Sequence, residues 1–197
     1  MKPTLSATAA EIETTWEIAE LLLSDIEAEY RRERLKPGGA QPLMGEAKNQ
    51  AISIILQVCQ LYRYAPESQR RQIWSFFEQT YSLATYAEEA GAQAAEQFLR
   101  TKEIDWLELA LTAWVIRYFD YRDNYLQFGG LYLEAIRLGC EPMPAFSNIG
   151  RISFGTSRAI LTGFEQSAFY HADVAPLVSD ARRGHYRYLG RDYGLPE

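Results

Sequence analysis

The sequence predicts an all-α fold, a compact bundle of about six or seven helices. The 75 residues between Pro66 and Pro142 contain no proline, and proline breaks helices because it lacks the N–H donor and clashes with the preceding turn. This stretch carries 14 of the chain's 26 aromatic residues, spaced by three and four positions as on a helix face. The composition, 47% apolar and 23% charged, is typical of a globular domain. A helical-repeat array is the alternative, because segments 101–118 and 120–137 resemble one antiparallel repeat unit.

Length and composition predict one helical domain, residues 1–180, followed by an Arg/Tyr-rich tail, residues 181–197. A chain of 197 residues buries enough surface to be stable without a disulfide or a metal. Cys59 and Cys140 show no CxxC spacing, and the N-terminus shows no secretory pattern. The longest uncharged run, residues 49–62, is too short to span a bilayer. We therefore expect reduced thiols, a cytoplasmic location and no membrane partner.

The first helix is expected to begin at Thr8 and to end before Pro37. Thr8 and Glu11 fit a capping box, in which each side chain bonds a free amide at the helix start. An apolar stripe with spacings of three and four residues follows. The stripe consists of Ile12, Trp16, Ala19, Leu23, Ile26 and Tyr30.

The other helices are expected at residues 46–64, 66–91 with an Ala-rich continuation to 100, 101–118, 120–137, 146–153, 157–168 and, as a turn, 174–183. Pro66, Thr101 and Asp120 suit helix starts, and Gly91 and Gly139 suit helix ends. The fourth helix is expected at the centre because it is apolar on both faces. The second and fifth helices are expected at the centre beside it. Residues 184–197 are expected to form a loose tail.

An acidic face on the first helix is the predicted partner-binding surface. Seven acidic residues and no basic residue lie between Glu11 and Glu29, and the whole chain has a net charge of −6. The predicted contact residues are Glu13, Glu17, Glu20 and Glu27. Such a face would favour a basic protein partner through charge complementarity. A solvated face without a partner is the alternative.

A polar cluster in an aromatic stretch is the predicted location of any ligand pocket. Its residues are Trp114, Arg117, Asp120, Arg122 and Asp123. Charged groups beside an aromatic core can line a binding cavity. The alternative is that Asp120 caps a helix and that the arginines pair with the aspartates in a turn between helices.

Metal, nucleotide and nucleophile motifs are missing from the sequence. Glu165, His171 and Asp173 are the one grouping that could ligate a metal, but their spacing does not place three ligands on one helical face. The segment from Gly150 to Ser157 resembles a phosphate-binding loop but has Thr156 where the lysine is required. No GxSxG or SxxK motif is present. We therefore expect no metal and no cofactor.

These observations predict a non-enzymatic protein-binding module of the adaptor, inhibitor or immunity type. A small-ligand-binding protein or enzyme with its pocket near residues 114–122 is the first alternative. Nucleic-acid binding by the tail is the second, because residues 182–188 interleave arginines with aromatic residues. The acidic chain does not favour nucleic acid as a partner, and the alternative for the tail is that its tyrosines pack on the domain.

Overall fold

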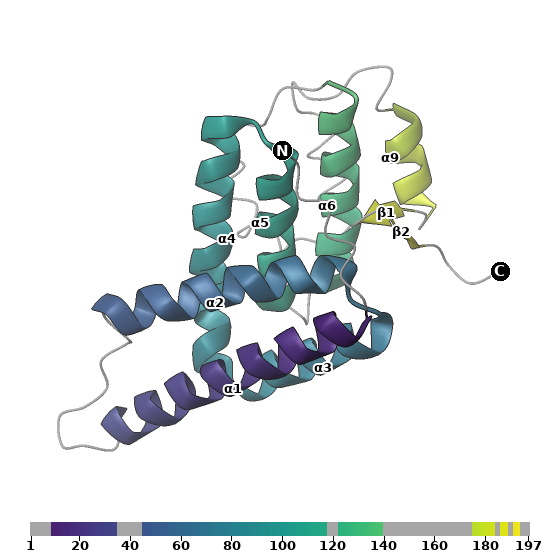
Figure 1. Ribbon diagram of the computed structural model, residues 1–197. Helices are drawn as coiled ribbons and strands as arrows, with labels where there is room; N and C mark the ends of the chain where they lie inside the picture. Colours follow the sequence, from purple (N-terminus) through teal and green to yellow (C-terminus); the bar gives the residue numbers. More distant parts are fainter. Residues whose placement is uncertain are drawn as a thin grey trace. The chain divides into compact units, whose positions relative to one another are not determined.

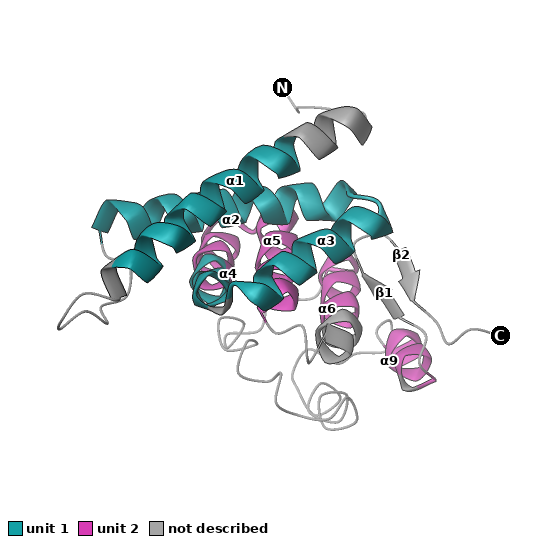
Figure 2. Cartoon of the chain, turned by 90° about the horizontal axis from the view of Figure 1, so that it is seen from below, with its two compact units in different colours: residues 1–90 teal, residues 91–197 magenta. Residues whose placement is uncertain are grey.

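The structure, a computed structural model, describes residues 9–34, 45–117, 122–139, 175–183, 186–188 and 191–193. The fold is all-α, as predicted, with seven helices among the described residues (Figure 1). The helices are α1 (Ala9–Arg34), α2 (Gly45–Tyr64), α3 (Glu67–Gln79), α4 (Tyr81–Thr101), α5 (Ile104–Arg117), α6 (Arg122–Arg137) and α9 (Ala175–Arg182). The chain divides into two compact units, Met1–Ala90 and Gly91–Glu197 (Figure 2). The boundary lies inside α4, and the single domain expected for residues 1–180 stays a prediction.

The core of the first unit is built from the apolar stripes of α1, α2 and α3. In α1 the predicted stripe is confirmed from Trp16 to Ile26, because Trp16, Ala19, Leu23 and Ile26 are buried; Tyr30 is half-buried, and the side chain of Ile12 is not among those described. The Trp16 ring meets the ring of Phe76 in α3 edge to face, with the centroids 5.7 Å apart. In α2 the stripe includes Cys59, whose thiol pKa is raised far above its ordinary value by burial. This thiol is therefore neutral and acts as a small apolar side chain.

The end of α2 is closed by a side chain from the next helix. Tyr62 lies four residues before Pro66, which has no N–H to offer its carbonyl oxygen. Arg70 supplies the donor instead: its Nε bonds the Tyr62 oxygen at 2.9 Å, and an Nη atom bonds the Arg63 oxygen at 2.9 Å. The Arg70 guanidinium also lies 5.0 Å from the centre of the Tyr62 ring. Arg70 is 1% exposed, so these contacts satisfy a buried cation.

The third helix was predicted to run from Pro66 to Gly91, and this prediction was wrong. α3 ends at Gln79, and α4 begins at Tyr81 and continues through Gly91 to Thr101. Thr80 makes the break, with φ −114° and ψ 61°, and its hydroxyl donates to the Phe76 carbonyl at 2.7 Å. The Thr80 carbonyl then accepts the first amides of the next helix. Pro66 stands at the N-cap rather than inside the helix.

Gly91 is required for packing rather than for ending a helix. A Cβ atom at this position would lie 2.5 Å from Nε1 of Trp114 in α5, closer than non-bonded atoms can approach. Trp114 is 1% exposed, so the indole ring occupies the space that the missing side chain leaves. The close approach of α4 and α5 in the second unit therefore depends on this glycine.

α5 is the central helix of the second unit, as its pattern predicted. Every residue from Ala110 to Ile116 is buried. α5 packs along α6 (Figure 1), and Glu108 of α5 forms an ion pair with Arg137 of α6 at 2.6 Å. Gly139 follows α6 with φ +90°, the left-handed conformation that favours glycine at a helix end. This end of α6 was predicted correctly.

The C-terminal segment differs from the loose tail that was expected. Two short strands, β1 (Tyr186–Tyr188) and β2 (Arg191–Tyr193), pair antiparallel with Tyr186 opposite Tyr193. β1 lies against α6, so this part of the tail belongs to the second unit. α9 confirms the helical turn expected near residues 174–183. The helices expected at 146–153 and 157–168, and Thr8 of the capping box, lie outside the described residues.

Candidate functional site

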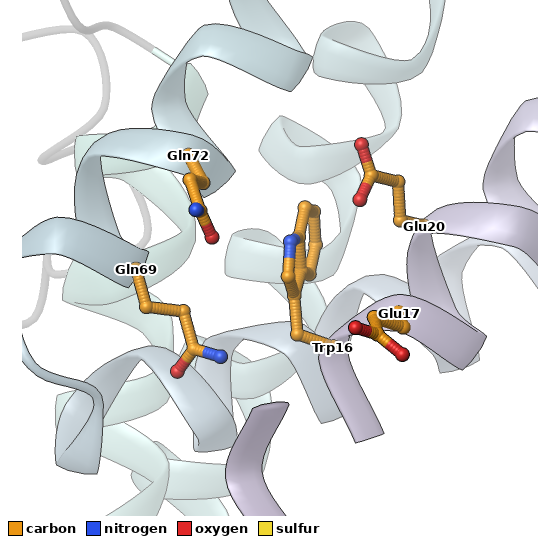
Figure 3. A pocket seen from close by; sticks show the side chains of 5 residues that line it. All are labelled: Trp16, Glu17, Glu20, Gln69 and Gln72. Carbon is orange, nitrogen blue, oxygen red and sulfur yellow. The ribbon is translucent and has the colours of Figure 1, made fainter. Parts of the chain in front are cut away.

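A pocket opens between α1 and α3 in the first unit. Its volume is about 390 Å³. Five residues line it, from α1 Trp16, Glu17 and Glu20 and from α3 Gln69 and Gln72 (Figure 3). In α1, Glu20 lies three positions after Glu17 and four after Trp16, and in α3, Gln72 lies three positions after Gln69, so each set lies on one side of its helix. The pocket is therefore built by two helix faces that meet around the Trp16 ring.

Gln69 is the lining residue whose burial the packing of the fold does not explain, because its side chain is polar. The residue is 3% exposed, and neither Oε1 nor Nε2 of its carboxamide has a hydrogen-bond partner among the residues that the structure describes. A buried polar group without a partner costs about 1–3 kcal/mol of folding free energy. Figure 3 shows Gln69 and Trp16 among the side chains that line the pocket. A group that entered the pocket and hydrogen-bonded to Gln69 would recover this cost.

Replacing Gln69 with leucine is expected to raise the free energy of unfolding by about 1–2 kcal/mol, because leucine fills similar space without burying an unpaired amide. Chemical denaturation of the two proteins measures the difference. The matched control is Gln79→Leu, at an exposed position of the same helix, which is expected to change stability by less than about 0.5 kcal/mol. A loss of stability in Gln69→Leu would show that the carboxamide contributes to the fold itself.

The charge of the pocket is negative. Glu17 and Glu20 make no ion pair with any residue that the structure describes. None of the five lining residues is basic. Figure 3 shows the Glu20 carboxylate on one side of the Trp16 ring and Gln72 on the other. The pocket therefore offers two carboxylates and two carboxamides around an aromatic wall, a set that favours a cationic hydrogen-bond donor.

An apolar strip lies on the exposed side of α1. Ile18, Leu21 and Leu22 are 55%, 64% and 40% exposed, and their spacing places them on one face of the helix. Glu17 lies one turn before Leu21, so the strip borders the acidic side of the pocket. Three large apolar side chains gathered on one exposed helix face mark a surface that is suited to binding another molecule.

The predicted acidic face is present only in part. Glu17 is exposed and Glu20 is half-buried, and both line the pocket. The prediction that Glu27 lies on the exposed acidic face was wrong. Glu27 is 7% exposed and accepts hydrogen bonds from Ser82 and from Arg31. It follows Ile26 directly and so falls beside the buried stripe rather than on the open face. Glu13 belongs to α1, and its side chain lies outside the described set.

The predicted pocket near residues 114–122 is described only at its edges. Trp114 is buried against Gly91, and Arg117 is half-buried at the end of α5. Arg122 and Asp123 open α6, but their side chains are not described, and Asp120 lies between the described segments. The ligand pocket expected here stays a prediction.

The metal candidates Glu165, His171 and Asp173 and the loop from Gly150 to Ser157 lie outside the described residues. Within the part of the chain that the structure describes, no three His, Cys, Asp or Glu residues are grouped as a metal site would require. The same residues include no helix that is long and apolar enough to cross a membrane.

Comparison with known proteins finds no match to this chain. No protein-family model, no curated protein and no solved structure is significantly similar to it.

Proposed function

We propose that this protein is a non-enzymatic protein-binding module that acts in the cytoplasm and binds a basic partner through α1. The observation that carries the proposal is the exposed strip of Ile18, Leu21 and Leu22, bordered by Glu17 and Glu20 without ion-pair partners among the described residues. The free thiol of Cys59 in the core accords with a reducing compartment.

The two kinds of residue in this surface serve different steps of association. The apolar strip provides area whose removal from water stabilises a complex by about 25 cal/mol per Å². The unpaired carboxylates attract a positively charged surface, which raises the association rate and excludes acidic partners. Binding should therefore weaken both when the charges are reversed and when the apolar side chains are truncated. Salt should strongly weaken only the electrostatic contribution of the carboxylates.

Reversing the charges of α1 is expected to abolish partner capture. Glu17→Lys with Glu20→Lys should lower the retention of a basic protein from native cytosol at least tenfold at low salt, and the wild-type complex should be lost at high salt. The control reverses two exposed acidic residues elsewhere, Glu96→Lys with Glu103→Lys, and should retain the partner within about twofold. Quantitative mass spectrometry of the bound fraction gives both results.

The apolar contribution is tested separately by Leu21→Ser. This variant should weaken capture while leaving its salt dependence unchanged, because no charge is altered. Equal capture by wild type, by the charge-reversed protein and by Leu21→Ser would remove α1 as the binding surface.

A further inference from the structure

The pocket between α1 and α3 has features that a general docking surface does not need. A flat acidic face would attract a basic partner without a cavity. Here the helices leave a volume of about 390 Å³, near the lower end of the range of about 300–1,000 Å³ that ligand pockets occupy. The buried carboxamide of Gln69 lines this pocket and has no hydrogen-bond partner within the described segments. We infer that this pocket binds a guanidinium group, and that this group is an arginine side chain of the partner.

The hydrogen-bonding groups of the pocket decide the charge of the bound group. Glu17 and Glu20 can only accept hydrogen bonds when ionised, and the oxygens of Gln69 and Gln72 accept as well. An anion would be repelled by both carboxylates, and a neutral group would leave them uncompensated. The bound group is therefore a cation with several N–H donors.

The shape of the surroundings favours guanidinium over ammonium. A guanidinium is planar and carries five donors in a fixed arrangement, so it can bond more than one acceptor group in one plane. Its flat face also stacks on aromatic rings, and Trp16 forms the wall between Glu20 and Gln72 (Figure 3). It is more weakly hydrated than an ammonium group, which lowers the cost of bringing it beside the buried Gln69.

The source of the guanidinium follows from the position of the pocket. Glu17 belongs to the pocket and also borders the apolar strip of α1. A partner that covered Leu21 would therefore hold its own side chains next to the opening. This assignment of the source to the partner rests on the proposed function, whereas the affinity of the pocket for guanidinium does not.

The first experiment titrates the protein with small probes and needs no partner. Trp16 is one of four tryptophans, so 5-fluorotryptophan labelling gives four ¹⁹F resonances. The Trp16 resonance is assigned as the one that is missing from the spectrum of the Trp16→Phe variant. N-acetyl-arginine methylamide is expected to shift the Trp16 resonance saturably, with a dissociation constant on the order of millimolar. The neutral citrulline analogue should bind at least tenfold more weakly, and the lysine analogue about threefold to tenfold more weakly.

Variants then test the pocket residues. Gln69→Leu and Glu20→Gln should each reduce the affinity for the arginine probe at least threefold, whereas Gln79→Leu, on the exposed side of α3, should leave it unchanged. Absence of a saturable Trp16 shift overturns the inference. So does equal binding of the citrulline analogue, or full affinity in Gln69→Leu, a variant that is expected to fold at least as stably as wild type.

The second experiment identifies the source of the guanidinium. The arginine probe at 10 mM, roughly ten times a millimolar dissociation constant, should release the captured partner, and the citrulline analogue at the same concentration should not. Probe binding without this competition overturns the assignment to the partner and leaves a site for free guanidino compounds. Capture that depends on Leu21 without any probe binding overturns the pocket and leaves the proposed function standing. Probe binding without any captured protein overturns the proposed function and leaves the guanidinium pocket standing.

Discussion

Replacing Arg70 with methionine is expected to lower the free energy of unfolding by about 3–5 kcal/mol. The change removes two buried hydrogen bonds from a charged donor, each worth about 1.5–3 kcal/mol, and leaves the carbonyl oxygens of Tyr62 and Arg63 without those donors. Pro66 provides no amide to replace them for Tyr62. Chemical denaturation monitored by circular dichroism gives the change in free energy.

Two further variants test whether the hydrogen bonds of Arg70 cause this loss of stability. Arg70→Lys keeps the charge but has a single nitrogen for the two carbonyls, so its loss should fall between wild type and Arg70→Met. Arg71→Met is the matched control, since Arg71 is exposed on the same helix and pairs only with Glu67 in the contacts described. It should cost less than about 1 kcal/mol. A loss in Arg70→Met as small as in Arg71→Met would contradict the capping role.

Replacing Gly91 with alanine is expected to lower the free energy of unfolding by roughly 2–3 kcal/mol, the cost of forcing an extra carbon into a packed core. The sign is informative, because the same substitution inside an exposed helix stabilises by about 1 kcal/mol. The new Cβ atom would lie 2.5 Å from Nε1 and 2.8 Å from Cδ1 of Trp114, so the ring or the helix has to move.

A double-mutant cycle with Trp114→Phe tests whether the ring causes this loss. The smaller ring should recover part of the cost of Gly91→Ala, which gives a coupling free energy of about 1 kcal/mol or more. Ala92→Ser, at an exposed position in the same turn, is the control and should change stability by less than about 0.5 kcal/mol. Stabilisation by Gly91→Ala would show that the helices separate at this point without cost.

The elements that sequence reasoning located correctly are those with an uninterrupted local pattern. The stripe from Trp16 to Ile26 determines α1, and a continuous run of apolar residues determines the burial of α5. Both patterns can be recognised from neighbouring residues alone. The break between α3 and α4 was missed because Gly91 is the stronger local signal for a helix end, whereas Thr80 ends α3 through its own backbone angles and its bond to Phe76.

The pocket between α1 and α3 was not predicted, and only two of its acidic residues were predicted as partner contacts. Glu17 and Glu20 were found from their charge, but Glu27 was placed on the same face although Ser82, 55 residues away, binds it inside the unit. Gln69 and Gln72 carried no signal, because glutamine on a helix is usually a solvated surface residue. Only tertiary packing buries the Gln69 carboxamide away from hydrogen-bond partners in the described part of the chain.

The connections between consecutive helices have a consequence for how the chain folds. α2 and α3 are joined by Ala65 and Pro66, α3 and α4 by Thr80 alone, and α4 and α5 by Lys102 and Glu103. Closing such short loops costs little chain entropy, so the contacts between successive helices form early and span few residues. Low contact order of this kind is typical of domains that fold within microseconds to milliseconds. Pairs of successive helices from α2 to α5 should therefore form well before the long-range bond between Glu27 of α1 and Ser82 of α4 is made.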